Sequence, residues 1–246
     1  MDDLTRSREG IRVEQLQVRR GRRIVLESVS FAHEHGVLAL LGPNGAGKSS
    51  LLAVLATLRR PAGGEIAIAG HRIATGKDRR AVRGAIGFQA QDDRPPAELR
   101  CADYVRYAAW LAGVDRSALD HATARALSRV NLTEHGRTRI RHLSGGMLRR
   151  LTIAAAIAHR PRVLLLDEPT AGLDPHERLS LTGVIRALAG SATIVMSTHL
   201  SDDVRRAADS VAVFSAGRMT FSGSLDSFER LAPGDLDEAY RAAVDR

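Results

Sequence analysis

This sequence has one cysteine, few aromatic residues and no long apolar run. Because Cys101 stands alone, the chain can form neither an internal disulfide nor a metal site built from cysteines, and a reducing cytoplasm is its simplest location. No apolar stretch approaches the ~20 residues that a membrane-spanning helix needs, and residues 1–10 lack the apolar centre of a signal peptide. Any work at a membrane would therefore depend on another chain that spans it.

Lysine is also scarce, since it occurs only at Lys48 and Lys77. The 36 basic residues nevertheless exceed the 28 acidic ones and give a formal net charge of +8, which could indicate a nucleic-acid partner. The arginines are scattered along the chain instead of gathered in one arm, and this favours a general bias toward arginine. We therefore expect no nucleic-acid partner, and the retention of Lys48 suggests a specific task for that side chain.

A glycine-rich stretch follows the apolar run at residues 37–41 and has the G-x-x-x-x-G-K-S pattern of a phosphate-binding loop. Glycines let consecutive backbone N–H groups face one anion, and the helix expected over residues 47–58 directs its positive end to the same point. Lys48 can then reach the β- and γ-phosphates, and the hydroxyl of Ser49 can ligate Mg²⁺. A chance glycine-rich turn would lack this strand and this helix. The predicted nucleotide-binding residues are Gly42, Pro43, Asn44, Gly45, Ala46, Gly47, Lys48, Ser49 and Ser50.

An acidic pair, Asp167 and Glu168, ends the apolar run at residues 163–166. In a parallel sheet the carboxyl end of such a strand lies beside a phosphate-binding loop, so Asp167 is predicted to complete a Mg²⁺ site with Ser49. Glu168 would then lie next to the γ-phosphate, where its carboxylate could orient and deprotonate an attacking water. Alone, such a pair could merely cap a helix or turn. Beside a phosphate-binding loop, the catalytic interpretation is favoured.

The order of apolar patterns predicts an α/β fold with a helical insertion. Alternating runs at residues 11–18 and 24–31 indicate an antiparallel start, and helical periodicity without strands fills residues 99–159. The other predicted strands cover 65–69, 85–88, 192–197, 211–214 and 218–221, and a further helix covers 175–189. The expected parts of this single domain of 1–246 are an α/β core with an antiparallel β-subdomain at about 11–90 and 160–223, a helical subdomain at about 91–159 and a helical tail at 224–246.

Four further motifs occur in the order found in ATP-binding-cassette (ABC) ATPases. Residues 143–147, Leu-Ser-Gly-Gly-Met, resemble the signature motif of that family, and Gln91 resembles its Q-loop glutamine. Residues 171–174 resemble its D-loop, and residues 197–199 end in a histidine that resembles its switch histidine. Each motif is weak alone, but together they extend the resemblance from about residue 11 to residue 228. The resemblance implies a RecA-like P-loop NTPase core that binds and hydrolyses ATP.

In this family two cassettes dimerise head to tail, and each ATP lies between one phosphate-binding loop and the opposite signature motif. The resemblance therefore implies a second nucleotide-binding subunit, which is either a second copy or a different chain. His199 would contact the γ-phosphate instead of being a solvated surface histidine, and Asp174 would reach across the dimer to help place the water of Glu168. Gln91 would sense Mg²⁺ or the water. The expected residues that bind the partner's nucleotide are Ser144, Gly145, Gly146 and Met147, and the expected Mg²⁺ ligands are Ser49, Gln91 and Asp167.

Two positions depart from the family pattern. The aromatic residue that usually stacks on adenine is replaced by Arg20, whose guanidinium plane could stack on the base or could be solvated, leaving adenine loosely held. Met147 replaces the commoner glutamine of the signature motif. This version resembles a subset of bacterial cassettes that serve exporters of drugs, antibiotics or lipids. We expect hydrolysis to survive the replacement, because that residue is not the main phosphate contact in the family.

Although aromatic residues make up only 4% of the chain, Tyr104, Tyr107 and Trp110 cluster at helical spacing after the Q-loop. In the family this region receives a helix of the transmembrane permease. We expect Tyr107 to pack inside the helical subdomain. Trp110 and the polar residues 92–94 are the expected contacts with the permease.

These observations predict the ATPase subunit of an ABC transporter, which converts ATP and water to ADP and phosphate. The subunit would energise a separate permease at the cytoplasmic face of the cell membrane, with export as the expected direction. The alternative is a soluble cassette ATPase that acts in iron–sulfur assembly or on DNA. DNA-associated cassettes usually carry coiled-coil or zinc-finger insertions, and ribosome-acting cassettes normally carry two cassettes in one chain. Neither feature occurs in this sequence.

Overall fold

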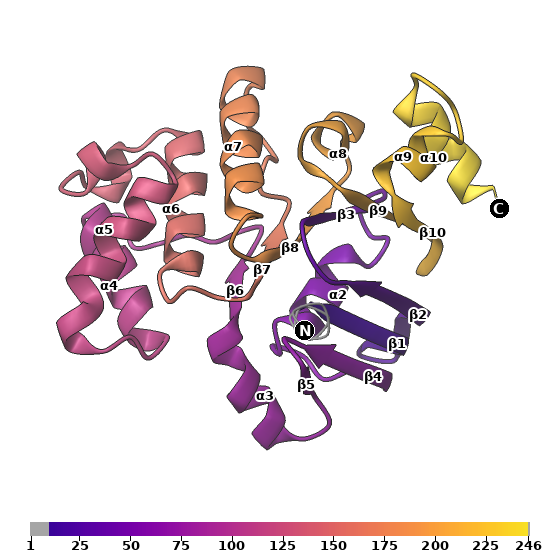
Figure 1. Ribbon diagram of the computed structural model, residues 1–246, viewed down its shortest axis with the longest axis horizontal. Coiled ribbons are helices and arrows are strands. Elements are labelled where there is room, and N and C mark those ends of the chain that lie inside the picture. The colour runs from indigo at the N-terminus through magenta and orange to yellow at the C-terminus, as the bar shows by residue number, and fades with distance from the viewer. Residues whose placement is uncertain (1–9, 246) are drawn as a thin grey trace, which may run out of the picture.

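The computed structural model describes residues 10–245, which form an antiparallel sheet, a mostly parallel sheet and a set of flanking helices (Figure 1). Residues 1–9, in which no signal peptide is expected, and Arg246 lie outside the described residues. Within residues 10–245, none of the helices combines the length and the apolar character needed to cross a membrane.

The mostly parallel sheet forms the centre of the core. Its strands, in the order in which they pair, are β10 (Arg218–Ser224), β9 (Ser210–Ser215), β3 (Val37–Leu41), β8 (Thr193–Thr198), β7 (Val163–Asp167) and β6 (Ile86–Gln89). Only β10 is antiparallel to its neighbour among these described strands. Every residue of β3 and β7 is buried, as expected for strands covered on both faces. Because parallel strands end at one edge, the loops after β3, β7 and β8 open at that edge.

The antiparallel sheet has the order β2 (Arg23–His33), β1 (Ile11–Arg20), β4 (Gly63–Ile68) and β5 (His71–Arg72). Its buried and exposed residues alternate along β1, which gives one apolar and one solvated face. The register shifts between Val13 and Leu16, and the extra residue allows Leu16 to remain inside. The two predicted alternating runs are therefore strands of one hairpin, whereas the two-residue strand β5 was too short to predict.

The helices are α2 (Lys48–Leu55), α3 (Gly76–Val82), α4 (Cys101–Leu111), α5 (Leu119–Arg129), α6 (Gly145–Ile157), α7 (Pro175–Leu188), α8 (Ser201–Ala207), α9 (Leu225–Glu229) and α10 (Leu236–Val244). Helices α4, α5 and α6 stand together at the end of the molecule opposite the antiparallel sheet (Figure 1). The strands predicted at 85–88, 163–166 and 192–197 and the hairpin at 211–221 are present within a residue or two at most ends. The predicted fold class, an α/β P-loop NTPase core with an antiparallel β-subdomain and a helical insertion, is confirmed.

Helix α4 corrects one prediction. Its buried face is formed by Cys101, Val105 and Ala109, which follow one another at four-residue spacing. Tyr107 and Trp110 lie away from that face and are 52% and 49% exposed, with ring centroids 5.9 Å apart. The prediction that Tyr107 packs inside the subdomain is wrong, because the stripe of small residues faces the core.

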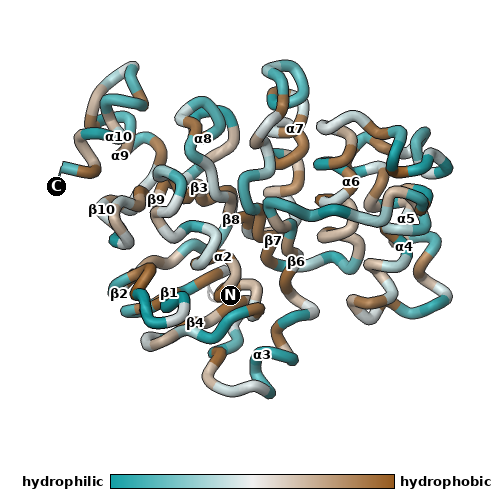
Figure 2. The backbone as a smooth tube through the Cα atoms, turned by 180° about the vertical axis from the view of Figure 1, so that it is seen from behind, coloured by the Kyte–Doolittle hydropathy of each residue, from teal (hydrophilic) through white to brown (hydrophobic). Residues whose placement is uncertain are grey.

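Two apolar clusters cover the two faces of the parallel sheet. Alternate residues of β3 enter different clusters, with Val37 and Leu41 in one and Leu38 and Leu40 in the other. The first cluster joins the sheet to α4, α5, α6 and α7, and the second joins it to α2 and the antiparallel sheet. Figure 2 shows that hydrophobic residues are concentrated along the middle strands. The helical segment is thus joined to the sheet by a continuous core.

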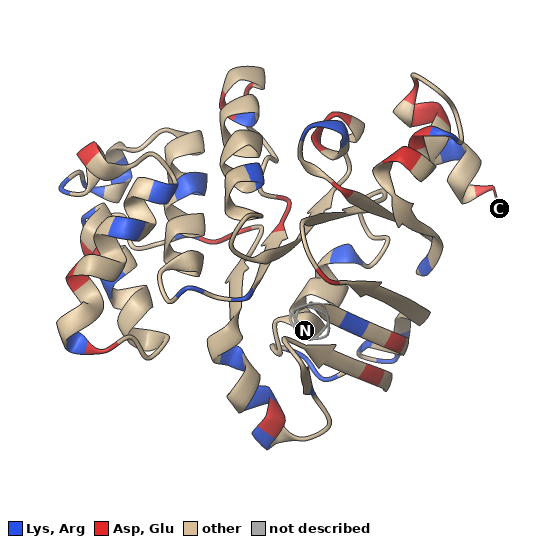
Figure 3. Cartoon of the chain, viewed as in Figure 1, with Lys and Arg blue, Asp and Glu red and all other residues tan. Residues whose placement is uncertain are grey.

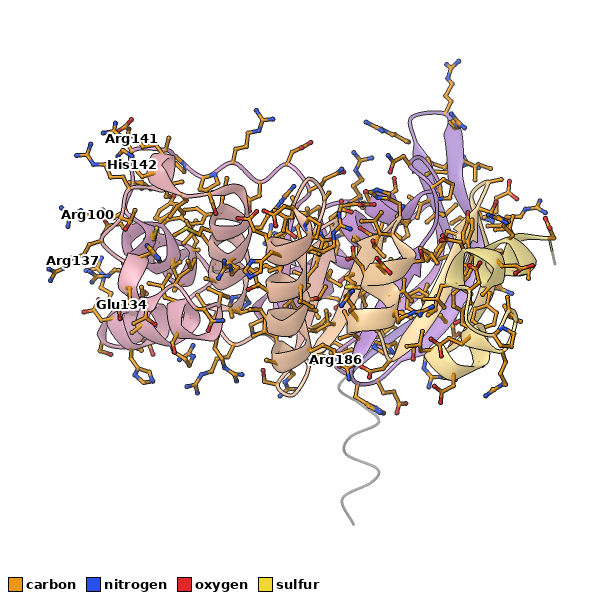
Figure 4. The ribbon with its side chains drawn as sticks, turned by 90° about the horizontal axis from the view of Figure 1, so that it is seen from above. Arg100, Glu134, Arg137, Arg141, His142 and Arg186 are labelled. Carbon is orange, nitrogen blue, oxygen red and sulfur yellow. The ribbon has the colours of Figure 1, made fainter. Side chains whose placement is uncertain are left out.

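Charged residues are distributed over all parts of the chain (Figure 3). Arg100, Arg137 and Arg141 point outward at the far end of the helical segment, whereas Arg186 lies on α7 (Figure 4). Several arginines form exposed ion pairs, such as Arg141 with Glu98 and Arg186 with Asp209. Such pairs contribute little to stability, typically about 0–1 kcal/mol each.

Candidate functional site

A cavity of about 590 Å³ opens above the loop between β3 and α2. Its walls come from segments far apart in the sequence: the turn after β1, the start of β2, the loop before α2, the loops after β6 and β7, and the turn between β9 and β10. The predicted residues that line it are Arg20, Pro43, Asn44, Gly45, Ala46, Gly47, Lys48, Ser49, Ser50, Gln91 and Glu168. The fold therefore brings the phosphate-binding loop, the Q-loop and the acidic pair to one place.

The loop at residues 42–47 depends on its glycines. A side chain on Gly42 would meet the carbonyl oxygen of Phe214 at 2.3 Å, and one on Gly47 would meet Leu26 at 2.5 Å. Gly47 also has a φ of 105°, a left-handed conformation that glycine adopts most easily. Helix α2 begins directly afterward, so its unpaired N–H groups face the cavity. The conformation is that of an anion-binding loop.

Lys48 is buried beneath this loop. Its Nζ donates to the carbonyl oxygens of Gly42 at 2.5 Å and Pro43 at 3.2 Å and lies 3.5 Å from Oε1 of Glu168. Burial lowers the pKa of Lys48, while the charge of Glu168 opposes that effect. A cation held in this way can exchange its carboxylate partner for the oxygens of a phosphate.

Asp167 lies at the end of β7 in a shell of hydroxyl groups. Its Oδ1 accepts hydrogen bonds from Ser49 Oγ at 3.0 Å and Ser197 Oγ at 2.6 Å. Burial raises the pKa of Asp167, and the two hydroxyl donors partly oppose the rise. The Ser49 hydroxyl and the Asp167 carboxylate provide the hard oxygen ligands that Mg²⁺ prefers beside phosphates. The donor set therefore fits the predicted metal.

Glu168 is held in a strained conformation. Its φ of 49° lies in the left-handed region, which for a side chain of this kind costs about 1–3 kcal/mol. The strain is maintained by Ser197, whose Oγ accepts from the backbone N–H of Glu168 at 2.8 Å. The carboxylate lies between Lys48 and His199, whose Nδ1 is 2.7 Å from Oε2. Strain with several contacts around one carboxylate is characteristic of a functional position.

His199 reaches the site from the end of β8. Its Nδ1 must carry a proton in order to donate to Glu168, so the imidazole ring is oriented by that carboxylate. The side chain is 39% exposed. A contact with a phosphate would use the other nitrogen, Nε2, if the bond to Glu168 persists.

The Q-loop is connected to the helix that carries the predicted signature motif. Gln91 lines the cavity, and its backbone carbonyl accepts a hydrogen bond from the guanidinium of Arg149 on α6. Asp93 lies nearby, and burial raises the pKa of its carboxyl group while the charge of Arg149 opposes that rise. A shift of the Q-loop would therefore be transmitted to α6.

Arg20 and Arg23 line the cavity together with Ile24 and Gly217. Arg20, the predicted adenine contact, is thus among the lining residues. Ile24 is 42% exposed and adds an apolar surface to the cavity, which the sequence motifs do not indicate. A planar base could contact the guanidinium group, the isoleucine or both.

The predicted signature residues lie elsewhere. Among the described residues, Ser144, Gly145, Gly146 and Met147 are all absent from the lining of the cavity. Ser144 is the N-cap of α6, and its Oγ accepts from the N–H of Met147 at 3.2 Å. The Met147 side chain packs against the first apolar cluster.

A carboxylate already occupies this helix end. Glu177 Oε1 accepts from Ser144 Oγ at 2.8 Å and from the N–H of Gly146 at 3.3 Å. Asp174 lies outside the cavity and caps α7, where its Oδ1 accepts from the N–H groups of His176 and Glu177. The start of α6 is therefore an anion-binding point separated from the cavity of its own chain.

Three side chains in these networks were not assigned a role from the sequence. Ser197 belongs to a predicted motif and could have been proposed from its position beside the strand that ends in Asp167. Arg149 and Glu177 contact residues that are 58 and 33 positions away in the chain. No local pattern indicates either contact.

Comparison with known proteins gives a consistent set of relatives. A family described as "ABC transporter" matches residues 26–171. The chain is 35% identical to the daunorubicin resistance ATP-binding protein DrrA3 of Streptomyces coeruleorubidus, over 95% of this chain and 74% of the relative. It is 38% identical to the methionine import ATP-binding protein MetN of Xanthomonas axonopodis pv. citri, over 76% of this chain and 57% of the relative. A solved ATP-binding subunit of an ABC transporter superposes with a TM-score of 0.81 at 29% identity, covering 95% of this chain and 99% of that one.

Proposed function

The chain belongs to the ABC transporter family as an ATP-binding subunit that hydrolyses ATP, and from this premise we propose that it works as one half of a dimer. Each of the two nucleotide sites is shared between the subunits. One subunit supplies the cavity above residues 42–50, and the other supplies the start of α6. Closure around ATP and opening after hydrolysis energise a separate transmembrane permease.

The observation that carries the proposal is the separation of two anion-binding points on one chain. Lys48 and the phosphate-binding loop line the cavity. Among the described residues, those of the signature motif do not line it. The start of α6 binds a carboxylate through Ser144 and Gly146 and could bind a phosphate through the same groups. A site that is split in this way is completed when a second chain faces the first.

Within the cavity, each residue has a distinct task. Lys48 and the N–H groups of the loop bind the β- and γ-phosphates. When the phosphates draw Lys48 away from Glu168, Oε1 of that carboxylate becomes free to orient a water and accept its proton. His199 holds the other carboxylate oxygen in place and faces the γ-phosphate with its remaining nitrogen.

Ser49 and Asp167 would hold Mg²⁺, with Gln91 as a further oxygen ligand from the Q-loop. Bound there, Mg²⁺ would neutralise charge on the β- and γ-phosphates during the transfer. Ser197 keeps the Asp167 carboxylate in its orientation, and the same hydroxyl supports the strained backbone of Glu168. Asp174 acts from the opposite subunit and helps to place the attacking water.

The permease would bind beside the Q-loop. Tyr107 and Trp110 form an exposed aromatic pair on α4, a type of surface that is common in protein interfaces. Docking there would hold the subunit at the cytoplasmic face of the cell membrane. Trp110→Ala should then weaken co-purification with the permease while leaving ATP hydrolysis by the isolated subunit unchanged.

Export is the proposed direction of transport. It is supported by matches to proteins named for daunorubicin and linearmycin resistance, each of which covers 95% of this chain, whereas matches to methionine import proteins cover 76–90% of it. The cargo class would be a drug, antibiotic, peptide or lipid. A test uses vesicles that contain the permease, with this subunit and ATP outside. ATP-driven uptake of daunorubicin into the vesicles would support export, and ATP-driven release of preloaded methionine would contradict it.

The dimer is tested with Glu168→Gln, a change that removes the proton acceptor and should trap the ATP-bound state. Light scattering at saturating ATP should give twice the mass of the 26.5 kDa chain, and with ADP the protein should stay monomeric. If the variant stays monomeric with ATP, even when its natural partner subunits are present, the proposed composite site is wrong. Co-purification with soluble assembly factors instead of a permease would favour the alternative of a cassette outside transport.

A further inference from the structure

The start of α6 is covered by a side chain of the same molecule. Oε1 of Glu177 lies 2.8 Å from Oγ of Ser144 and 3.3 Å from the backbone nitrogen of Gly146. A β-carbon on Gly146 would meet the carboxylate carbon at 2.6 Å, so the carboxylate lies directly against the glycine backbone. These are the same donors that the proposed dimer offers to the phosphate of the opposite subunit.

The backbone of Glu177 is held in place, whereas its side chain can change conformation. It is the third residue of α7, where its N–H donates to the capping carboxylate of Asp174 at 2.9 Å. The side chain is only partly buried and is in contact with a hydroxyl and an amide, without a cationic partner within ion-pair distance among the described residues. A carboxylate of this kind can rotate into solvent when a stronger anion competes for the donors.

The two anions differ in charge and in the number of acceptor oxygens. A carboxylate carries one negative charge and uses one oxygen here, whereas a terminal phosphate offers three oxygens and more charge to the same helix end. A triphosphate on the facing subunit can therefore replace the carboxylate, while a diphosphate ends one phosphate short of this position. In the proposed dimer, such an exchange would distinguish ATP from ADP when the subunits close.

We propose that Glu177 is a specificity-determining residue of the composite site: its carboxylate masks the start of α6 until the terminal phosphate of a nucleotide on the facing subunit displaces it. The inference rests on the proposed dimer for its function. The masking contact itself belongs to a single chain and can be tested without a dimer.

The first experiment measures masking in the nucleotide-free monomer, with inorganic phosphate as the probe. The backbone amide signal of Gly146 is followed by NMR in the unmutated protein, in Glu177→Ala and in Glu134→Gln. The last variant removes an exposed acid elsewhere in the helical segment and controls for net charge (Figure 4). Glu177→Ala should bind phosphate at this amide about tenfold more tightly, while Glu134→Gln should match the unmutated protein. Equal affinities in all three proteins would overturn the proposal.

The second experiment measures what the mask does to closure. In the Glu168→Gln background, light scattering is recorded against the concentrations of ATP and of ADP. Adding Glu177→Ala should lower the ATP concentration for half-maximal dimerisation several-fold and reduce the preference for ATP over ADP. Adding His176→Ala, which changes the neighbouring exposed side chain of α7, should change neither value. An unchanged or higher ATP requirement with Glu177→Ala would contradict the proposal.

The two experiments separate the two ideas. If Glu177→Ala gains phosphate binding but Glu168→Gln never dimerises, the mask is real and the proposed dimer is wrong. If Glu168→Gln dimerises and Glu177→Ala alters neither phosphate binding nor closure, the dimer stands and the mask is overturned. A contact with a merely structural role would not produce a gain of affinity, so the direction of the change is decisive.

Discussion

The two anion-binding points of this chain differ in how completely they are built. At the cavity above the phosphate-binding loop the charged groups are enclosed by protein, since Lys48, Asp167 and Glu168 are each 5% exposed or less. The start of α6 lies on the surface, where Ser144 is exposed and the bound anion is a side chain of the same molecule. Both use backbone N–H groups at a helix N-terminus, but only the first is enclosed.

This difference indicates that the two anion-binding points would contribute to ATP binding at different stages. The enclosed point has its charges arranged before ATP arrives, because Glu168 and the backbone carbonyl groups hold Lys48 in place. Such preorganisation favours tight binding and a positioned water. In the proposed dimer, the open point contributes only after the second subunit approaches it. Changes in the cavity should therefore affect a single chain, whereas changes at α6 should affect assembly.

The largest expected effect is on hydrolysis by Glu168→Gln. The variant keeps the shape of the side chain but cannot accept a proton, so the turnover rate should fall by about 10²–10⁴-fold. ATP affinity should stay within a few-fold, because Lys48 and the loop are intact. A steady-state phosphate-release assay with a nucleotide-binding measurement checks both values. Near-normal turnover would remove Glu168 from the proposed mechanism.

Lys48→Ala should abolish binding at the enclosed point. It removes the only lysine or arginine within ion-pair distance of Glu168 among the described residues and leaves the His199 ring as the remaining ionisable contact of that buried carboxylate; breaking a buried ion pair typically costs about 3–5 kcal/mol. The dissociation constant for ATP, measured by calorimetry, should rise by at least about 100-fold, and ATP should no longer cause dimerisation. Lys77→Ala, which changes the other lysine on exposed α3, is the matched control and should have no effect on either measurement.

Asp167→Asn should raise the thermal stability of the nucleotide-free protein while abolishing ATP hydrolysis. Because burial raises the pKa of Asp167 above its ordinary value of about 3.9, the ionised form is disfavoured in the folded protein. At pH 7–8 without nucleotide, the variant should melt at a higher temperature, by about 2–4 °C for each kcal/mol relieved. The difference should shrink as the pH falls through the raised pKa and vanish below about 3.9. With Mg²⁺ and ATP the order should reverse, and hydrolysis should be lost; a variant that melts lower at every pH would contradict the assignment.

The smallest expected effect concerns the predicted adenine contact. Arg20→Tyr should tighten ATP binding by about 5–20-fold, because an aromatic ring on a base is worth about 1–3 kcal/mol and Arg20 or Ile24 would already supply part of that contact. Binding of free phosphate in the cavity should be unchanged. If ATP affinity does not change, Arg20 does not contact the base and its alignment to the usual aromatic position is wrong.

Most residues of the enclosed point could be predicted, because they lie in short stretches of sequence with recognisable patterns. The apolar strand, the glycines, Lys48 and Ser49 lie within a short stretch, and Asp167 and Glu168 directly follow a strand that is apolar throughout. Sheet topology then brings the two stretches together, since parallel strands end at one edge. The same reasoning predicted the main strands of both sheets.

The remaining features depend on packing between distant segments. The contact of Glu177 with Ser144 exists because the N-termini of α6 and α7 meet, and the contact of Arg149 with Gln91 exists because α6 packs beside the Q-loop. Helices α3 and α8 have seven residues each, too few for a clear period of 3.6. The exposure of Tyr107 could not be predicted from its aromatic character, because the core face of α4 is formed by the small residues Cys101, Val105 and Ala109.

The central claim is that the start of α6 binds a nucleotide held by another subunit. Its most direct test compares Glu168→Gln with the double variant Glu168→Gln/Ser144→Arg, measuring ATP affinity under dilute conditions and molecular mass at saturating ATP. Glu168→Gln/Ser128→Arg, changed at an exposed serine on α5, is the matched control. We predict equal ATP affinity for all three monomers, with dimers for the first and the control but not for the Ser144→Arg variant. Dimerisation of that variant at the same ATP concentration as the control would contradict the account.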